Sequence, residues 1–172
     1  MKHFRWFLGA LLLGILANLT IAQEAISFES HDVSIVLDEA GYEAAATLTV
    51  PEGDGPFPTM ILLHGSGPYD MDATYTLPDG TVVSTNFKRI AEELAMQGVA
   101  VLRYNKRGVL ADRSIDFAQA QAATLDVLIA DAEAVLAFAQ AQPEVDPDAI
   151  YLFGWSEGAW VASHVTTNQL DT

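Results

Sequence analysis

Three short apolar runs constrain the fold of this chain more than any other feature of its sequence. They cover residues 59–63 (TMILL), 99–104 (VAVLRY) and 149–154 (AIYLFG), and none alternates strictly between apolar and polar side chains. A strand has this composition when both faces of its sheet are covered, which is typical of parallel sheets in α/β proteins. The runs therefore predict three buried strands.

Segments with helical spacing separate and follow these runs. Residues 86–98 and 122–142 repeat apolar side chains on one helical face, and they end at Gly98 and before Pro143. A third helical pattern, SEGAWVASHV, starts at residue 156. Each predicted strand is thus followed by a predicted helix, the order that builds a parallel sheet through helical crossovers.

A β-rich pair of segments precedes the first run. Residues 33–37 and 43–50 flank the turn cluster DEAGY, which predicts an antiparallel hairpin. The whole order predicts an α/β fold with a mostly parallel sheet, helices on both faces and an N-terminal antiparallel hairpin.

A serine lies between two glycines at the end of the third run. Residues 154–158 read GWSEG, the G-x-S-x-G pattern of a sharp strand-to-helix turn that exposes a nucleophilic serine, here Ser156. Gly154 and Gly158 have no Cβ, so such a turn can close without a steric clash. A predicted strand precedes the pattern and a predicted helix follows it, as this turn requires. The alternative is that Ser156 only caps the helix.

Three motifs together resemble the α/β-hydrolase superfamily. The resemblance is to its esterase and serine-aminopeptidase-like branch, which is similar to dienelactone hydrolases and to the catalytic domain of prolyl-oligopeptidase-type enzymes. The motifs are HGSGPYDMD from residue 64, LRYNKRGV from residue 102 and GWSEGA from residue 154. The family commonly has HGSGP with two spaced aspartates, matched by Asp70 and Asp72, then RYDKRG and GHSEG. The resemblance covers most of residues 42–165 and implies an α/β-hydrolase-type sheet.

The chain departs from the family pattern at three places. Asn105 stands where the family commonly has Asp, and VLADRS at residues 109–114 replaces the usual glycine and serine. Trp155 replaces the frequent histidine before the nucleophile, which predicts a bulky aromatic side chain beside the site.

The resemblance implies a triad in which Asp or Glu and then His follow the serine along the chain. Only His164 follows Ser156, eight positions on, and eight helical residues rise about 12 Å, so its imidazole should point away from the serine. His64 belongs to the HGSG turn, where we expect a structural hydrogen bond, and His31 lies in the hairpin. We therefore expect residues 23–172 to be the N-terminal part of an α/β-hydrolase domain, with the acid and base in a missing C-terminal part.

Acyl transfer also needs backbone N–H donors for the developing oxyanion. The resemblance implies that one donor comes from the HGSG turn, where we choose Ser66 over Gly65, and the other is expected to be Glu157, which follows the nucleophile at a helix N-terminus. Arg103 and Arg107, with Lys106 between them, lie at the carboxyl end of the second run, where α/β sheets bind ligands, and could orient a substrate carboxylate. The structural alternative is ion pairing with the aspartates of the HGSG loop. We expect no metal and no cofactor.

Charge and the N-terminus limit the partners and the location. A net charge of −15 repels phosphate, so nucleic acid is not an expected partner. Residues 1–22 combine two basic residues, an apolar run and small residues ending at Ala22, which predicts a signal peptide and a secreted or periplasmic protein. A membrane role is expected only if that peptide stays uncleaved, because the run is shorter than the about 20 residues that span a bilayer. The lack of cysteine excludes a thiol nucleophile.

The expected function is hydrolysis of a carboxylic ester, a small-molecule substrate, through an acyl-enzyme intermediate on Ser156. By itself this chain is expected to be inactive. An aminopeptidase or a thioesterase stays open as an alternative enzyme. A noncatalytic α/β-hydrolase-like binding module, which keeps the serine turn without a triad, is the alternative from another class.

Overall fold

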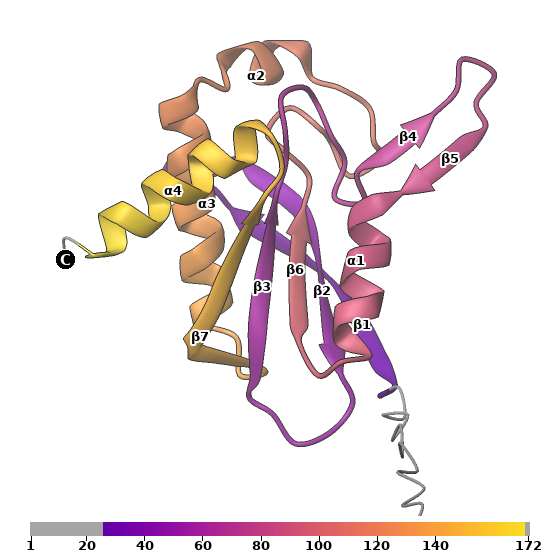
Figure 1. Ribbon diagram of the computed structural model, residues 1–172. Coiled ribbons are helices and arrows are strands. Elements are labelled where there is room, and N and C mark those ends of the chain that lie inside the picture. The colour runs from indigo at the N-terminus through magenta and orange to yellow at the C-terminus, as the bar shows by residue number, and fades with distance from the viewer. Residues whose placement is uncertain (1–25, 171–172) are drawn as a thin grey trace, which may run out of the picture.

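A five-stranded mixed sheet forms the centre of the structure, a computed structural model that describes residues 26–170. Its strand order is β1-β2-β6-β3-β7 (Figure 1). These strands are β1 (Phe28–Val36), β2 (Glu43–Pro51), β3 (Phe57–Leu63), β6 (Ala100–Tyr104) and β7 (Val145–Gly154). The predicted signal peptide at residues 1–22, with its cleavage site, lies outside the described residues.

The sheet combines an antiparallel hairpin with three parallel strands. β1 and β2 form the predicted hairpin, and β2 also pairs antiparallel with β6. β3 runs parallel to both β6 and β7. Helices α1 (Asn86–Ala95) and α3 (Leu125–Gln140) supply the two crossovers, and α4 (Glu157–Leu170) follows the last strand. The predicted fold class is thereby confirmed.

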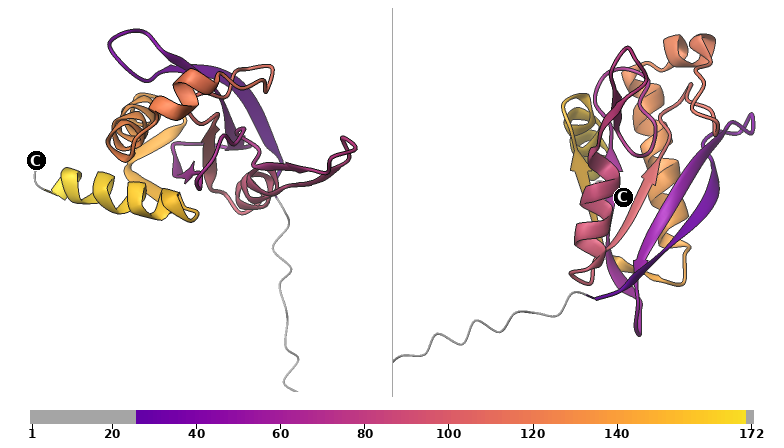
Figure 2. Two further views of the ribbon diagram at one scale, coloured as in Figure 1. Left: turned by 90° about the horizontal axis from the view of Figure 1, so that it is seen from above. Right: turned by 90° about the vertical axis from the view of Figure 1, so that its right-hand side faces the viewer.

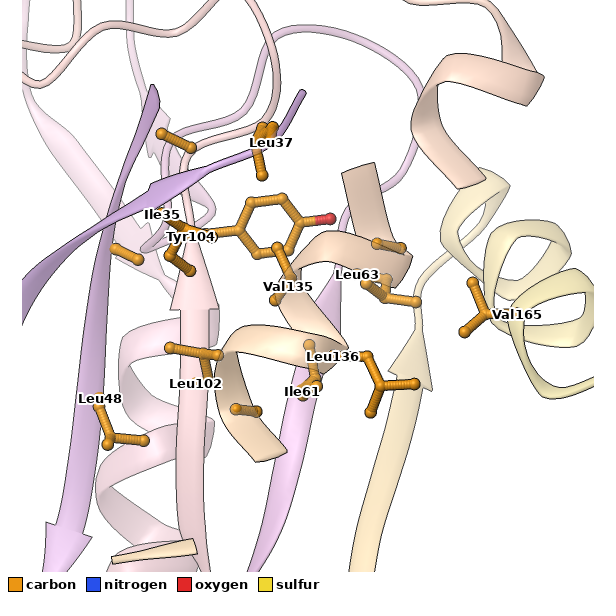
Figure 3. Packing of buried hydrophobic residues seen from close by; sticks show 14 of the residues in the cluster. Ile35, Leu37, Leu48, Ile61, Leu63, Leu102, Tyr104, Val135, Leu136 and Val165 are labelled. Atoms are coloured by element: carbon orange, nitrogen blue, oxygen red, sulfur yellow. The ribbon is translucent and has the colours of Figure 1, made fainter. Parts of the chain in front are cut away.

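Helices cover both faces of the sheet, with α1 on one side and α3 on the other (Figure 2). On the α3 side, the strand register aligns Leu48, Leu102 and Ile61 in one row across three strands. This row packs with Val135 and Leu136 of α3 (Figure 3). Burial of each such aliphatic side chain contributes about 1.5–3 kcal/mol, so this face holds the sheet and α3 together.

The opposite face has a smaller core under α1. Phe87 and Ala91 of α1 pack with Leu62 of β3 and Val101 of β6. Both faces of β3 and β6 are therefore buried, which explains why their sequences show continuous apolar runs. No helix in the described part of the chain is long and apolar enough to cross a membrane.

Three small elements were not predicted. The short helix α2 (Phe117–Ala122) precedes α3, and the strands β4 (Thr74–Thr76) and β5 (Val82–Thr85) form a hairpin within the loop after β3. α3 is shorter than the predicted helix at 122–142, because Thr124 caps its N-terminus by accepting a hydrogen bond from the Val127 N–H at 3.4 Å.

Candidate active site

Ser156 occupies a strained turn between the last strand and the last helix. Its φ is 54°, in the left-handed region that non-glycine residues rarely adopt. β7 ends at Gly154 and α4 begins at Glu157, so the chain reverses within two residues. Its side chain is exposed to solvent, and within residues 26–170 its hydroxyl has no hydrogen-bond partner. Strain of this kind persists where the surrounding structure imposes it, and it is common at functional sites.

The two glycines of the turn allow a close backbone contact with the end of β3. A Cβ on Gly158 would lie 2.3 Å from the Leu63 carbonyl oxygen, and a Cβ on Gly154 would lie 2.3 Å from the Gly158 carbonyl oxygen. The Trp155 N–H donates to the same Leu63 carbonyl at 3.0 Å. The turn is therefore held against β3 by a packing that only glycine permits at residues 154 and 158.

The HGSG loop, which directly follows β3, also lies against the serine. A Cβ on Gly65 would lie 3.2 Å from the Ser156 Cβ, so the two backbones are in close contact. Ser66, Ser156 and Glu157 line one open cavity of about 500 Å³, together with Leu125 and Trp160. The structure thus brings the predicted nucleophile and both predicted oxyanion residues to one place.

The two predicted donors are unengaged. Among the hydrogen bonds of the described residues, none is donated by the backbone N–H of Ser66 or of Glu157. Glu157 is also the first residue of α4, so its N–H lies at the positive end of the helix dipole. Within residues 26–170, neither N–H group is therefore bonded to another acceptor.

Lys106 links Gly65, the residue before Ser66, to the side chain of Glu157. Its Nζ donates to the Gly65 carbonyl at 2.8 Å and to the Glu157 carboxylate at 2.5 Å. Only 10% of its side chain is exposed. The sequence placed Lys106 near the site but gave no sign of these partners, because they lie 41 and 51 positions away along the chain.

Arg103 lies in a buried ion pair. Its Nη1 contacts Asp72, which also accepts from Arg113 Nη2 at 2.8 Å, and Arg113 further contacts Asp70 at 3.4 Å. Arg103 and Asp72 are both buried. The geometry thus matches the alternative of pairing with the HGSG-loop aspartates, and it leaves Arg103 poorly placed to orient a substrate.

Arg107 is paired with other carboxylates. It donates to both oxygens of Asp131 on α3, at 2.9 and 2.5 Å, and contacts Asp38 at 3.0 Å. Its guanidinium also lies 4.3 Å from the Tyr42 ring centroid. The hydrogen bond to Asp131 raises the pKa of Arg107, so the guanidinium stays charged. Like Arg103, it fills a structural role in this geometry.

None of the three described histidines lies where it could activate Ser156. His64 is stacked on Phe87, its Nε2 lies 2.9 Å from the Tyr104 carbonyl, and burial lowers its pKa to about 4. His164 is exposed, and its Nδ1 lies 2.8 Å from the Trp160 carbonyl within α4. His31 is an exposed residue of β1 beside Glu29. The described residues also contain no group of three or more potential ligands that could hold a metal ion.

Two of the three departures from the family pattern, Asn105 and Trp155, have local contacts in the structure. The Asn105 amide oxygen accepts from the Met71 N–H at 2.7 Å, and its NH₂ group donates to the Leu110 carbonyl at 2.8 Å. A carboxylate could not make the second bond, because an ionised Asp only accepts. Trp155 precedes the serine in the chain, and its ring lies 5.3 Å from the Tyr69 ring.

Sequence reasoning missed Leu125 and Trp160 as cavity residues. Trp160 lies four positions after Ser156 on α4, and residues with this spacing share a helical face. That spacing is a signal from which its position could have been inferred. Leu125 comes from α3 and carries no such local signal.

Comparison with known proteins identifies similar esterases and hydrolases. The chain is 41% identical over 83 residues to Esterase EstD of Thermotoga maritima, a match that covers 47% of this chain and 17% of that protein. No family model matches the chain.

Solved structures with a similar arrangement include a dienelactone hydrolase-like promiscuous phosphotriesterase from metagenomic libraries. Its TM-score is 0.60 at 17% identity, over 83% of this chain and 55% of that one. The carboxylesterase EstE1, also from a metagenomic library, has a TM-score of 0.55 at 24% identity, over 87% of this chain and 44% of that one. A dienelactone hydrolase from Anabaena variabilis has a TM-score of 0.56 at 17% identity, over 84% of this chain and 60% of that one.

These likenesses confirm the resemblance to α/β-hydrolases of the esterase and dienelactone hydrolase type that the three motifs predicted. The chain has an α/β-hydrolase fold. It covers less than two thirds of the length of each of these relatives.

Proposed function

We propose that this chain carries the nucleophile and the oxyanion site of a serine hydrolase that cleaves carboxylic esters. One observation supports this most directly. Ser156 has a φ of 54° in a turn closed by Gly154 and Gly158, and the exposed serine lies in one cavity with Ser66 and Glu157. A helix cap needs neither the strained backbone nor the approach of the HGSG loop.

In the proposed reaction, the Ser156 oxygen attacks the acyl carbon of the ester while a base takes its proton. The carbonyl oxygen becomes negative and accepts hydrogen bonds from the Ser66 and Glu157 N–H groups, each worth about 3 kcal/mol in such sites. The tetrahedral species collapses and releases the alcohol, which receives the proton from the base. Water then attacks the acyl-enzyme in the same manner and releases the acid.

The base and the acid that orients it are proposed to come from outside residues 26–170. The described histidines are a buried His64, an exposed His31 and a His164 that contacts its own helix. A serine hydroxyl without a positioned base is a poor nucleophile. The described residues alone should therefore turn over esters negligibly.

The substrate is proposed to be an uncharged ester with an apolar acyl group. Leu125 and Trp160 give the cavity apolar walls, and the nearby cations are already paired with carboxylates. The net charge of −15 further disfavours anionic substrates.

A fluorophosphonate probe tests this function. In the protein expressed from the complete gene, the probe should label Ser156, and short-chain p-nitrophenyl esters should be hydrolysed. Ser156→Ala should abolish labelling and lower turnover by several orders of magnitude, because triad members act as a unit. Labelling that persists in Ser156→Ala would refute the assignment of the nucleophile.

A noncatalytic binding module is the second candidate function. The observation that favours it is that no histidine among residues 26–170 lies where it could activate Ser156. The same experiment separates the two functions, because a binding module would neither label nor hydrolyse esters, thioesters or aminoacyl amides when expressed from the complete gene.

A further inference from the structure

We propose that Lys106 is a positioning residue that orients both backbone donors of the oxyanion site. The inference rests on the proposed function. Its basis is that the buried ammonium group of Lys106 contacts Gly65, the residue before the donor Ser66, and also the side chain of the donor Glu157. Lys106 Nζ lies 2.8 Å from the Gly65 carbonyl oxygen and 2.5 Å from the Glu157 carboxylate.

The planarity of the peptide bond makes the first contact a constraint on Ser66. The Gly65 carbonyl and the Ser66 N–H belong to one peptide unit, and the cis bond among the described residues is at Gly55–Pro56. In a trans unit the two groups point in opposite directions. A carbonyl held toward Lys106 therefore directs the Ser66 N–H away from it, and Ser66 lines the cavity that contains Ser156.

The HGSG loop needs such a constraint, because its glycines leave the backbone free to rotate. Gly65 has no Cβ, and Gly67 has a φ of 107°, a conformation that favours glycine. Without the hydrogen bond from Lys106 to the Gly65 carbonyl oxygen, that peptide unit could rotate and turn the Ser66 N–H away from the cavity. Lys106 itself is fixed by its backbone N–H, which donates to the Tyr69 carbonyl at 3.1 Å.

The second contact fixes the other donor relative to the first. Glu157 is the first residue of α4, and its carboxylate accepts a hydrogen bond from the same ammonium group. The HGSG loop and the N-terminus of α4 are thereby joined through one atom. A site that must hold an oxyanion to within about 0.5 Å benefits from such a link.

The charge of Lys106 also strengthens the Ser66 donor. A cation bonded to the Gly65 carbonyl draws electron density through the peptide unit and makes its N–H a better donor, because linked hydrogen bonds polarise one another. A neutral side chain at residue 106 would remove both the orientation and the polarisation.

Kinetics of substitution variants in the protein expressed from the complete gene test this proposal. Lys106→Met should lower kcat for p-nitrophenyl esters about 10- to 100-fold with little change in KM, since the donors act on the transition state more than on the bound ester. Lys106→Arg, which can donate to both acceptors, should recover part of this loss. The matched control is Lys88→Met on α1, where Lys88 is half exposed and pairs with Glu92 at 3.9 Å. This control should keep the wild-type kcat.

A boronic acid inhibitor gives a readout that a loss of stability would not produce. The Ser156 oxygen bonds to boron, its proton passes to the base, and the boron becomes tetrahedral and negative like the reaction intermediate. The inhibition constant should rise in Lys106→Met by about the factor by which kcat falls. Glu157→Gln keeps a hydrogen-bonding side chain but removes the ion pair, so its inhibition constant should rise by a smaller factor, several-fold. The Glu157 side chain is 31% exposed, so this substitution does not alter a buried position.

The outcomes distinguish the two proposals. A wild-type protein that neither labels nor hydrolyses any ester would overturn the proposed function and this inference with it. An active wild type whose Lys106→Met variant matches Lys88→Met in kcat and in boronic acid affinity would overturn the role of Lys106 alone. If Lys106→Met does not fold, an unchanged boronic acid affinity in Glu157→Gln would overturn it as well.

Discussion

Gly158→Ala should separate helix α4 from the sheet and disable the serine turn. The added Cβ would lie 2.3 Å from the Leu63 carbonyl oxygen, 2.7 Å from the Leu63 carbonyl carbon and 2.8 Å from the His64 carbonyl oxygen. All three atoms are backbone atoms at the end of β3, so no side chain can move aside. Reaching an ordinary van der Waals distance requires a displacement of roughly 1 Å.

The expected cost follows from this displacement. Overpacking in a core typically costs about 1–3 kcal/mol, and the upper end applies here because two backbone segments must part. A shift of about 1 Å at Ser156, the proposed nucleophile, should also lower the rate about 100-fold. Unfolding in denaturant would measure the first effect, and the rate of fluorophosphonate labelling would measure the second, both in the protein expressed from the complete gene.

Gly80→Ala is the control for Gly158→Ala. Gly80 lies in the turn between β4 and β5 with a φ of 87° and no atom within 4 Å of an added Cβ. Its substitution should cost only the backbone penalty of about 1 kcal/mol and leave the labelling rate unchanged. If Gly158→Ala stayed within about 0.5 kcal/mol of the wild type and labelled at the same rate, α4 would not pack on β3 in the manner described.

Three further predictions concern the rest of the molecule. The pKa of His64 is about 4 in the folded protein, below its ordinary value of about 6.5, so the unfolded chain takes up the proton first as the pH falls. Between pH 7 and pH 3.5, the free energy of unfolding should therefore decrease by about 3 kcal/mol more in the wild type than in His64→Gln. Denaturation curves that give the same decrease for both proteins would contradict this. Arg107→Met should destabilise the protein by about 3–5 kcal/mol, because it removes the main partner of the buried Asp131, and Arg107→Met combined with Asp131→Leu should recover much of the loss in the same measurement. Equal losses in the single and double variants would show that the ion pair is not the cause. We propose that the protein is exported and cleaved after Ala22, so intact-mass measurement should show a chain that begins at Gln23, whereas recovery of the uncleaved chain in membranes would indicate an anchor.

The main fold could be predicted because strands that are buried on both faces have continuous apolar sequences. Ile61 and Leu102 face α3 while their neighbours Leu62 and Val101 face α1, so both strands are apolar along their length. Such runs identify strands covered on both faces, and the intervening helical patterns fix the crossovers.

The unpredicted elements α2, β4 and β5 are largely exposed, so their sequences show no continuous apolar run. α2 has no buried residue, and most of β4 and β5 is exposed. The start of α2 depends on Asp116, whose carboxylate accepts from the N–H groups of Ala118 and Gln119. This is a local capping signal, and it does not stand out because Asp112 offers a second possible cap four residues earlier.

The serine turn could be predicted because its steric requirements are local. Gly154, Ser156 and Gly158 lie within five residues, and the close contacts that require glycine arise wherever a strand turns this sharply into a helix. The partners of a charged side chain are set by tertiary structure instead. Nothing near Lys106 in the sequence indicates that Gly65 and Glu157 will meet its ammonium group.

The basic cluster at residues 103–107 illustrates this difference and changes the inferred substrate. Strand β6 directs Arg103 toward Asp72, in the loop after β3, and the chain beyond the strand directs Lys106 to α4 and Arg107 to α3. Three neighbouring cations thus tie the carboxyl end of one strand to three surrounding segments. An anionic substrate could engage Arg103 or Arg107 only by breaking a buried ion pair, at a cost of several kcal/mol. The positive charge that suggested a substrate carboxylate is therefore already neutralised within the fold, which supports the proposal of an uncharged ester substrate.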